Sequence, residues 1–148
     1  MGIVSRLMAC GLLLLTVTSC ASGVKFTQAN PPLTPTHTES GRIFFYRPSA
    51  FGVALRPDVL LNGDKVGEAI AWGFFYVDRP PGHYEVLTST EVDRTLTFVL
   101  EPGQTRFVRF STSVGFFVGY VYGELIDLEV GLSEIQDCKY TGGEPLVP

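Results

Sequence analysis

The 148-residue chain has few of the side chains from which catalytic and metal sites are built. It contains three cysteines, two histidines and one tryptophan, and only 18% of its residues are charged. A structural zinc site needs about four cysteine and histidine ligands, and His83 is the single histidine after residue 40. No Walker loop or dinucleotide fingerprint is present. The sequence therefore predicts no catalytic residues, no metal and no cofactor.

Basic side chains are also scarce, with 11 lysines and arginines against 15 aspartates and glutamates. Arg106 and Arg109 are the densest basic pair, and Glu101 lies close to them in the chain. Binding of nucleic acid needs a basic patch or stripe. The composition therefore excludes nucleic acid as a partner.

No apolar run reaches the roughly 20 residues that a membrane-spanning helix requires. Residues 7–17 form a shorter uncharged apolar run that follows Arg6. A basic start, an apolar core and small residues before a cleavage point make a secretory signal. We therefore expect residues 1–19 to be a signal peptide, whose removal leaves 129 residues with a net charge of −5, enough for one domain.

The end of this signal, Val17-Thr18-Ser19-Cys20, resembles the bacterial lipobox, in which an aliphatic and two small residues precede an obligatory cysteine. The resemblance implies that Cys20 is lipidated, that cleavage occurs before it and that the new amino terminus is acylated. Two or more acyl chains give stable membrane anchoring, whereas one is marginal. Ala21, where aspartate would favour the inner membrane, points to the outer membrane, facing the periplasm or the cell surface. An ordinary secretory signal with an incidental Cys20 is the alternative.

Cysteine counting leaves no intramolecular disulfide in the mature chain. Cys10 lies in the signal and Cys20 is the predicted lipidation site, so Cys138 remains alone. We expect Cys138 to be a buried structural cysteine, the alternative being intermolecular pairing. The fold must then be held together by its apolar core.

Residues 20–40 form the predicted lipidated terminus and a flexible tether that is rich in proline and threonine. Such a composition buries too little apolar surface to fold, and its proline-rich part is expected to be extended. Twenty extended residues span at most about 66–72 Å. The tether would therefore let the domain stand off the bilayer.

Residues 41–140 alternate short β-branched and aromatic runs with glycine and proline turns, which is typical of strands. The expected strands are 41–47, 59–61, 65–68, 73–78, 83–90, 94–100, 105–111 and 125–130, with one bulged strand or two short ones within 114–126. Asn62-Gly63 predicts a type I′ hairpin turn, Pro81-Gly82 the centre of a type II turn, and Pro102-Gly103 a further turn.

Seven to nine short strands predict an all-β domain folded as an antiparallel β-sandwich of the immunoglobulin type. One short helical turn is expected within Ser133–Lys139, and no longer helical period is present. Residues 141–148 are expected to be a disordered tail.

The first half of this domain carries a family resemblance through five motifs, Gly41–Arg47, Pro57–Gly63, Val66-Gly67, Gly73–Asp78 and Pro80–His83. In this order they resemble a family of uncharacterised bacterial lipoproteins described as domain of unknown function 2846, and the small PEGA-type β-sandwich modules. The resemblance covers Gly41 to about Leu87. It implies a lipoprotein with a β-sandwich, and it transfers no catalytic residues because the family has none established.

Three short patterns imitate catalytic motifs, and each has a simpler interpretation. His83 follows a Pro-Gly turn at the start of a strand, which explains it without a role as general base. Gly131–Ile135 imitates a nucleophile elbow, but its last residue is not glycine and no histidine follows Ser133. Asp127 and Glu129, which cluster with Glu134 and Asp137, are explained by a solvated strand face.

The most unusual stretch is residues 115–123, which combine four aromatics with three glycines. The simplest interpretation is a core strand. The sharper hypothesis is an exposed aromatic groove around Phe116–Tyr122, in which Phe117, Tyr120 and Tyr122 bind a lipid, a peptide or a partner strand.

Taken together, these patterns predict a membrane-anchored lipoprotein of the cell envelope, with a non-enzymatic domain that interacts with envelope proteins or a surface polymer. The alternative is a β-sandwich that binds a small ligand or lipid in the aromatic groove. The binding partner, the oligomeric state and the biological process stay open.

Overall fold

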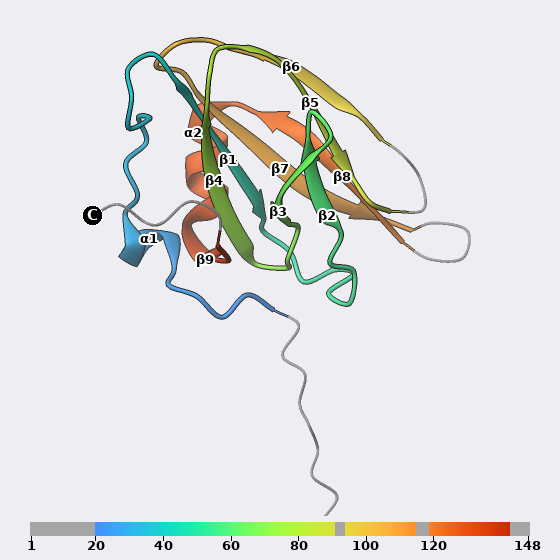
Figure 1. Ribbon diagram of the computed structural model, residues 1–148. Helices are drawn as coiled ribbons and strands as arrows, with labels where there is room; N and C mark the ends of the chain where they lie inside the picture. Colours follow the sequence, from blue (N-terminus) through green and yellow to red (C-terminus); the bar gives the residue numbers. More distant parts are fainter. Residues whose placement is uncertain (1–19, 91–93, 115–118, 143–148) are drawn as a thin grey trace, which may run out of the picture.

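The computed structural model describes residues 20–90, 94–114 and 119–142. Its strands form two sheets that face each other (Figure 1), one ordered β8-β7-β1-β4-β9 and the other β3-β2-β5-β6. The strands are β1 Gly41–Arg47, β2 Asp58–Leu61, β3 Asp64–Glu68, β4 Gly73–Arg79, β5 Gly82–Thr88, β6 Leu96–Leu100, β7 Thr105–Ser113, β8 Tyr120–Ile126 and β9 Lys139–Tyr140. The predicted β-sandwich is confirmed, with the difference that the pairs β1–β7 and β4–β9 are parallel.

Turn chemistry explains two of the strand boundaries. Asn62 and Gly63 have φ of 50° and 87° between β2 and β3, as a type I′ turn requires. Gly103, with φ of 69°, turns the chain between β6 and β7. The type II turn expected at Pro81-Gly82 is wrong, because Gly82 is already the first residue of β5.

The five-stranded sheet is buried on both faces at its centre, where all seven residues of β1 and the first five of β4 are buried. Between the sheets lies a core that includes Ile43, Phe45, Phe75, Val108 and Phe110. A second core covers the outer face of this sheet and consists of Phe26, Phe44, Tyr46, Phe74, Tyr76, Phe107, Ile135 and Cys138. The molecule therefore has a third layer, built from α1 (Phe26–Ala29), α2 (Leu128–Glu134) and the 3₁₀ helix η1 (Ile135–Asp137).

Residues 21–40, here called the N-terminal strap, supply part of this third layer. Phe26 is buried, and its ring packs edge-to-face on Phe44 and Phe74 with centroid distances of 5.9 and 5.3 Å. Lys25 forms an antiparallel bridge with Lys139 of β9. The prediction of a flexible tether is therefore wrong for these residues, because one aromatic anchor and a set of backbone hydrogen bonds hold a segment whose composition is otherwise polar.

The chain after β8 also differs from the prediction. A strand was expected over 125–130 with Leu128 and Val130 inward, but these two residues belong to α2 and are 47% and 45% exposed. Gly131 allows α2 to lie directly on the sheet, since a Cβ at this position would be 2.6 Å from Cγ of Phe107. The turn expected within Ser133–Lys139 is present as η1, which β9 follows. None of the described helices is long and apolar enough to cross a membrane.

Candidate functional site

Cys20, the predicted lipidation site, is exposed and directly precedes a residue that is fixed to the fold. Ala21 is buried, and its N–H donates a hydrogen bond of 3.1 Å to the carbonyl of Ala71. Gly23 lies against the backbone of Tyr140, whose carbonyl oxygen would be 1.9 Å from a Cβ at Gly23. The N–H of Tyr140 donates to the carbonyl of Val24 at 2.8 Å. The chain is thus attached to the sandwich within one residue of Cys20.

A hollow of about 320 Å³ adjoins Cys20 on the surface. Residues of four separate segments line it, among them Ser22 of the strap, Arg56 before β2, Ile70 after β3 and Thr141 after β9. The start of the strap and the end of the described chain therefore lie at the same end of the molecule.

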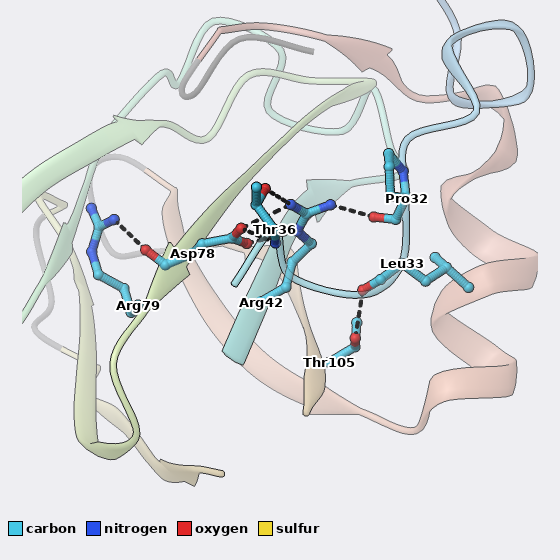
Figure 2. Close-up of polar contacts among 7 residues, drawn as sticks. All are labelled: Pro32, Leu33, Thr36, Arg42, Asp78, Arg79 and Thr105. Carbon is cyan, nitrogen blue, oxygen red and sulfur yellow. Dashed lines mark hydrogen bonds and ion pairs between the residues drawn. The ribbon is translucent and has the colours of Figure 1, made fainter. Parts of the chain in front are cut away.

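The second half of the strap is held by an ion pair between β1 and β4 (Figure 2). Arg42 and Asp78 are direct partners in the antiparallel register, with Nε to Oδ1 at 2.7 Å and Nη2 to Oδ2 at 2.9 Å. Their side chains are only 2% and 9% exposed. The guanidinium also lies 4.3 Å from the ring centroid of Tyr76. This is a bidentate, desolvated pair, the geometry in which arginine and carboxylate bind most strongly.

The strap supplies the remaining partners of this pair. Arg42 Nη1 donates to the carbonyl of Pro32, and the N–H of Thr36 donates to Asp78 Oδ2 at 2.9 Å. Beside them, the Thr105 hydroxyl donates to the carbonyl of Leu33 at 2.6 Å. Burial alone would raise the pKa of Asp78, but the hydrogen bonds from Arg42 and Thr36 outweigh it and hold the pKa below its ordinary value. The Arg42–Asp78 pair therefore acts as a clamp on the strap.

The clamp predicts a specific acid sensitivity. Because the folded-state pKa of Asp78 is lowered, its contribution to stability is complete above the unfolded value of about 3.9 and is lost as the pH falls through the folded pKa. Wild type should therefore lose more free energy of unfolding on acidification from pH 5 to pH 3 than Asp78→Asn does. Urea titrations across that range measure the difference, and equal losses in the two proteins would contradict the assignment.

Arg47, at the end of β1, is a second buried guanidinium. Its Nη1 donates to the carbonyls of Leu55 and Ala69 at 2.7 and 3.0 Å. Its Nη2 donates to the carbonyls of Phe51 and Gly52 at 2.7 and 2.9 Å, and to the hydroxyl of Thr112 at 2.8 Å. Burial lowers the pKa of this group. Arg47 thus holds the loop between β1 and β2 against β7.

A third polar cluster connects α2 to the five-stranded sheet. Arg109 on β7 lies between Glu134 at 2.8 Å and Glu124 at 3.3 Å. The Tyr46 hydroxyl donates to Glu134 at 2.7 Å, and the Ser111 hydroxyl donates to Glu124 at 2.6 Å. Burial, followed by the hydrogen bond to Glu134, raises the pKa of Tyr46. Each of these side chains has a partner within the cluster. The cluster is therefore explained by its role in holding α2 against the sheet.

The structure disperses the acidic residues that the sequence brings together. Glu134 belongs to the Arg109 cluster, and Asp137 pairs with Lys25 of the strap at 2.9 Å. His83 is exposed on β5. The Ser133 hydroxyl donates to the carbonyl of Val130 inside α2, so Gly131–Ile135 does not form a nucleophile elbow. Within residues 20–90, 94–114 and 119–142, no three histidine, cysteine or acidic side chains gather as metal ligands.

The predicted aromatic surface is visible only in part, because Phe117 lies outside the described residues. Tyr120 and Tyr122 are half-buried on β8, with ring centroids 5.9 Å apart. The Arg94 guanidinium covers both rings at 4.9 and 5.0 Å, and its Nη2 donates to the Tyr120 hydroxyl at 3.0 Å. The two tyrosines thus form an aromatic pair that carries a positive charge on its surface.

Cys138 is buried in the second core, as expected. Burial raises the pKa of its thiol to about 12. The thiolate is the reactive form of cysteine, so the folded protein keeps this residue in its unreactive state.

Comparison with known proteins places the central part of this architecture in a family. The model of a family described as "Protein of unknown function (DUF2846)" matches residues 37–122, more than half of the chain. The chain belongs to the DUF2846 family. This confirms the resemblance seen in the motifs between Gly41 and Leu87.

One curated relative of this DUF2846 protein is described as an "Uncharacterized protein" of Haemophilus influenzae (strain ATCC 51907 / DSM 11121 / KW20 / Rd). The two are 31% identical over 94 residues, which are 63% of this chain and 56% of the relative. The chain thus spans just over half the length of that protein. No solved structure matches the present chain.

The DUF2846 match includes the residues of two buried charge sites, Arg42, Asp78 and Arg47, and the last part of the strap. Sequence reasoning missed these sites. A signal for them was nevertheless present, because the run from Gly41 to Arg47 lacks polar residues on either face between its two arginines. A strand of this kind is buried on both faces, and charges within it require buried partners.

Proposed function

We propose that this DUF2846 protein is a lipoprotein of the cell envelope, anchored through Cys20, and that its β-sandwich is a non-enzymatic interaction module. The observation that carries the proposal is the position of the lipobox. Val17–Cys20 ends on an exposed cysteine, and the next residue, Ala21, is buried in the fold. A modified thiol at this boundary leaves the folded domain undisturbed.

Two features support a binding role rather than a catalytic one. Within the cluster around Arg42 and within the cluster around Arg109, the charged side chains form ion pairs with one another. These pairs hold the strap and α2 in place. The chain without its signal has a net charge of −5. The partner that we propose is an envelope protein or a surface polymer. The outer membrane, facing the periplasm or the cell surface, is the proposed location because Ala21 follows Cys20.

Binding of a small ligand or lipid is the second candidate function, favoured by the aromatic pair Tyr120 and Tyr122 under Arg94. An aromatic pair with a guanidinium over its rings combines apolar surface with positive charge, which suits an anionic amphiphile. Mass spectrometry of the purified protein distinguishes the two candidates. A lipid that co-purifies with wild type and is lost in Tyr120→Ala favours the ligand role, whereas envelope proteins recovered with wild type favour the interaction role.

Cys20→Ala should abolish incorporation of a clickable palmitate analogue in the native host, because the modified thiol and the processed amino terminus both belong to Cys20. Cys10→Ala is the matched control, since it removes another cysteine of the same amino-terminal segment and should leave labelling unchanged. Labelling is read from the protein band after metabolic feeding, together with its recovery in the membrane fraction. Equal labelling of wild type and Cys20→Ala would refute the anchor.

A further inference from the structure

The length of free chain at Cys20 limits how far the domain can stand from a membrane. Ala21 is buried and hydrogen-bonded to Ala71, so only Cys20 itself separates the fold from the proposed acyl chains. One residue spans at most about 3.3–3.6 Å. Anchoring at this position therefore brings the surface next to Cys20 into the lipid headgroup region.

Trp72 directly follows Ala71, the residue whose carbonyl accepts the hydrogen bond from Ala21. Its N–H donates to the carbonyl of Arg47 at 2.8 Å, and its own carbonyl accepts from Lys139 at the same distance. Its side chain is nevertheless 36% exposed, and Val24 of the strap, which is hydrogen-bonded to Tyr140, is 48% exposed. The backbone of Trp72 is thus fixed while a large apolar side chain faces outward.

The backbone conformation of Trp72 is unfavourable for its residue type. Its φ is 54°, and the other non-glycine residues with positive φ in the described chain are Asn30 and Asn62. Asparagine tolerates this region, whereas a bulky residue there is a rare outlier. Glycine or asparagine would suit the turn better, so the fold alone does not explain an indole at this position.

We propose that the domain rests directly on the bilayer, with the indole of Trp72 inserted at the headgroup level beside the acyl chains of Cys20. The inference rests on the proposed lipidation of Cys20. Tryptophan prefers the membrane–water interface, where its apolar ring and polar N–H are both accommodated. Ile70 and Arg56 line the hollow next to Cys20, and arginine there can contact lipid phosphates. The occupant of this face is therefore a lipid surface.

Trp72 is the single tryptophan of the protein, so its fluorescence reports on this face alone. The lipidated full-length protein is reconstituted into phosphatidylethanolamine–phosphatidylglycerol vesicles that contain lipids brominated near the headgroup. We expect emission to fall at least about two-fold relative to vesicles without bromine, because bromine quenches indole on contact. The control is Trp72→Phe combined with Val99→Trp, which moves the reporter to an exposed position on β6. Figure 1 shows β6 at the end of the molecule opposite to the first strap residues, and this variant should not be quenched.

Flotation of the vesicles separates this inference from the proposed function. Protein that fails to float with the vesicles would refute lipid anchoring itself. Protein that floats while Trp72 is quenched no more than the control would leave the anchor intact and overturn the membrane-contacting face. A blue shift that depends on protein concentration in detergent, without vesicles, would assign the face to a second copy and also overturn it. Trp72→Asn should keep or raise the Tm, and a clear fall would assign the indole to the fold instead.

Discussion

Asp78→Ala should lower the free energy of unfolding by about 3–5 kcal/mol, because it leaves the buried Arg42 guanidinium without its counter-charge. The variant also removes the acceptor of the Thr36 N–H, so the strap should separate from the sheet. Chemical denaturation followed by Trp72 fluorescence measures the first effect. Hydrogen exchange at the amides of Leu33, Thr34 and Thr36 measures the second, and it should accelerate there before global unfolding.

The chain offers a matched control for this prediction. Asp58 pairs with Lys65 at the same distance of 2.7 Å, but both side chains are about half exposed. Exposed ion pairs of this kind contribute about 0–1 kcal/mol, so Asp58→Ala should change stability little and leave exchange in the strap unaltered. Equal destabilisation by Asp58→Ala and Asp78→Ala would show that the clamp has no special importance.

Arg47→Met should destabilise the protein by more than about 3 kcal/mol. Methionine fills much of the same volume but leaves the carbonyls of Phe51, Leu55 and Ala69 and the hydroxyl of Thr112 without this donor. The Gly52 carbonyl keeps the N–H of Leu55 as its donor. Each buried acceptor without a partner costs about 1–3 kcal/mol, while the total stability of a domain of this kind is about 5–15 kcal/mol. The loop between β1 and β2 should open first, which hydrogen exchange at Leu55 and Ala69 detects.

Arg106→Met is the appropriate comparison for Arg47→Met. Arg106 donates only to the carbonyl of Val99, at 3.2–3.3 Å and at an exposed position. Its loss should change the free energy of unfolding by less than about 0.5 kcal/mol. Folding of Arg47→Met with wild-type stability would mean that water replaces the guanidinium, and would contradict its role in holding the loop.

The parts of this fold that sequence reasoning predicts are those that local chemistry determines. Asn62-Gly63 specifies its own turn, and the period-two pattern of Leu96, Phe98 and Leu100 places three side chains toward one core. The strand from Gly41 to Arg47 is predicted with its observed bounds because its composition permits little else. Such features need no information about distant residues.

The errors arise where distant residues decide the outcome. Residues 125–130 alternate like a strand, yet Gly131 lets the chain pack as a helix on Phe107, which precedes it by 24 positions. The strap is polar, and its attachment depends on Phe26 reaching Phe44 and Phe74 and on carbonyls that Arg42 and Thr105 bind. Composition does not reveal such pairings. The buried clamp was missed for the same reason.

The attachment of the strap to β9 affects when the strap can fold relative to the rest of the chain. The N–H of Phe26 donates to the carbonyl of Cys138 at 2.8 Å, and Lys25 pairs with Asp137, 112 positions away. Contacts between such distant segments form late, since a long loop must close first. If the chain is exported as proposed, the part of the strap's docking site that β9 and η1 supply is missing until nearly the whole chain has emerged. Enzymes that modify Cys20 would then meet an amino-terminal segment not yet fixed at β9, and the strap would close on β9 only after they had finished.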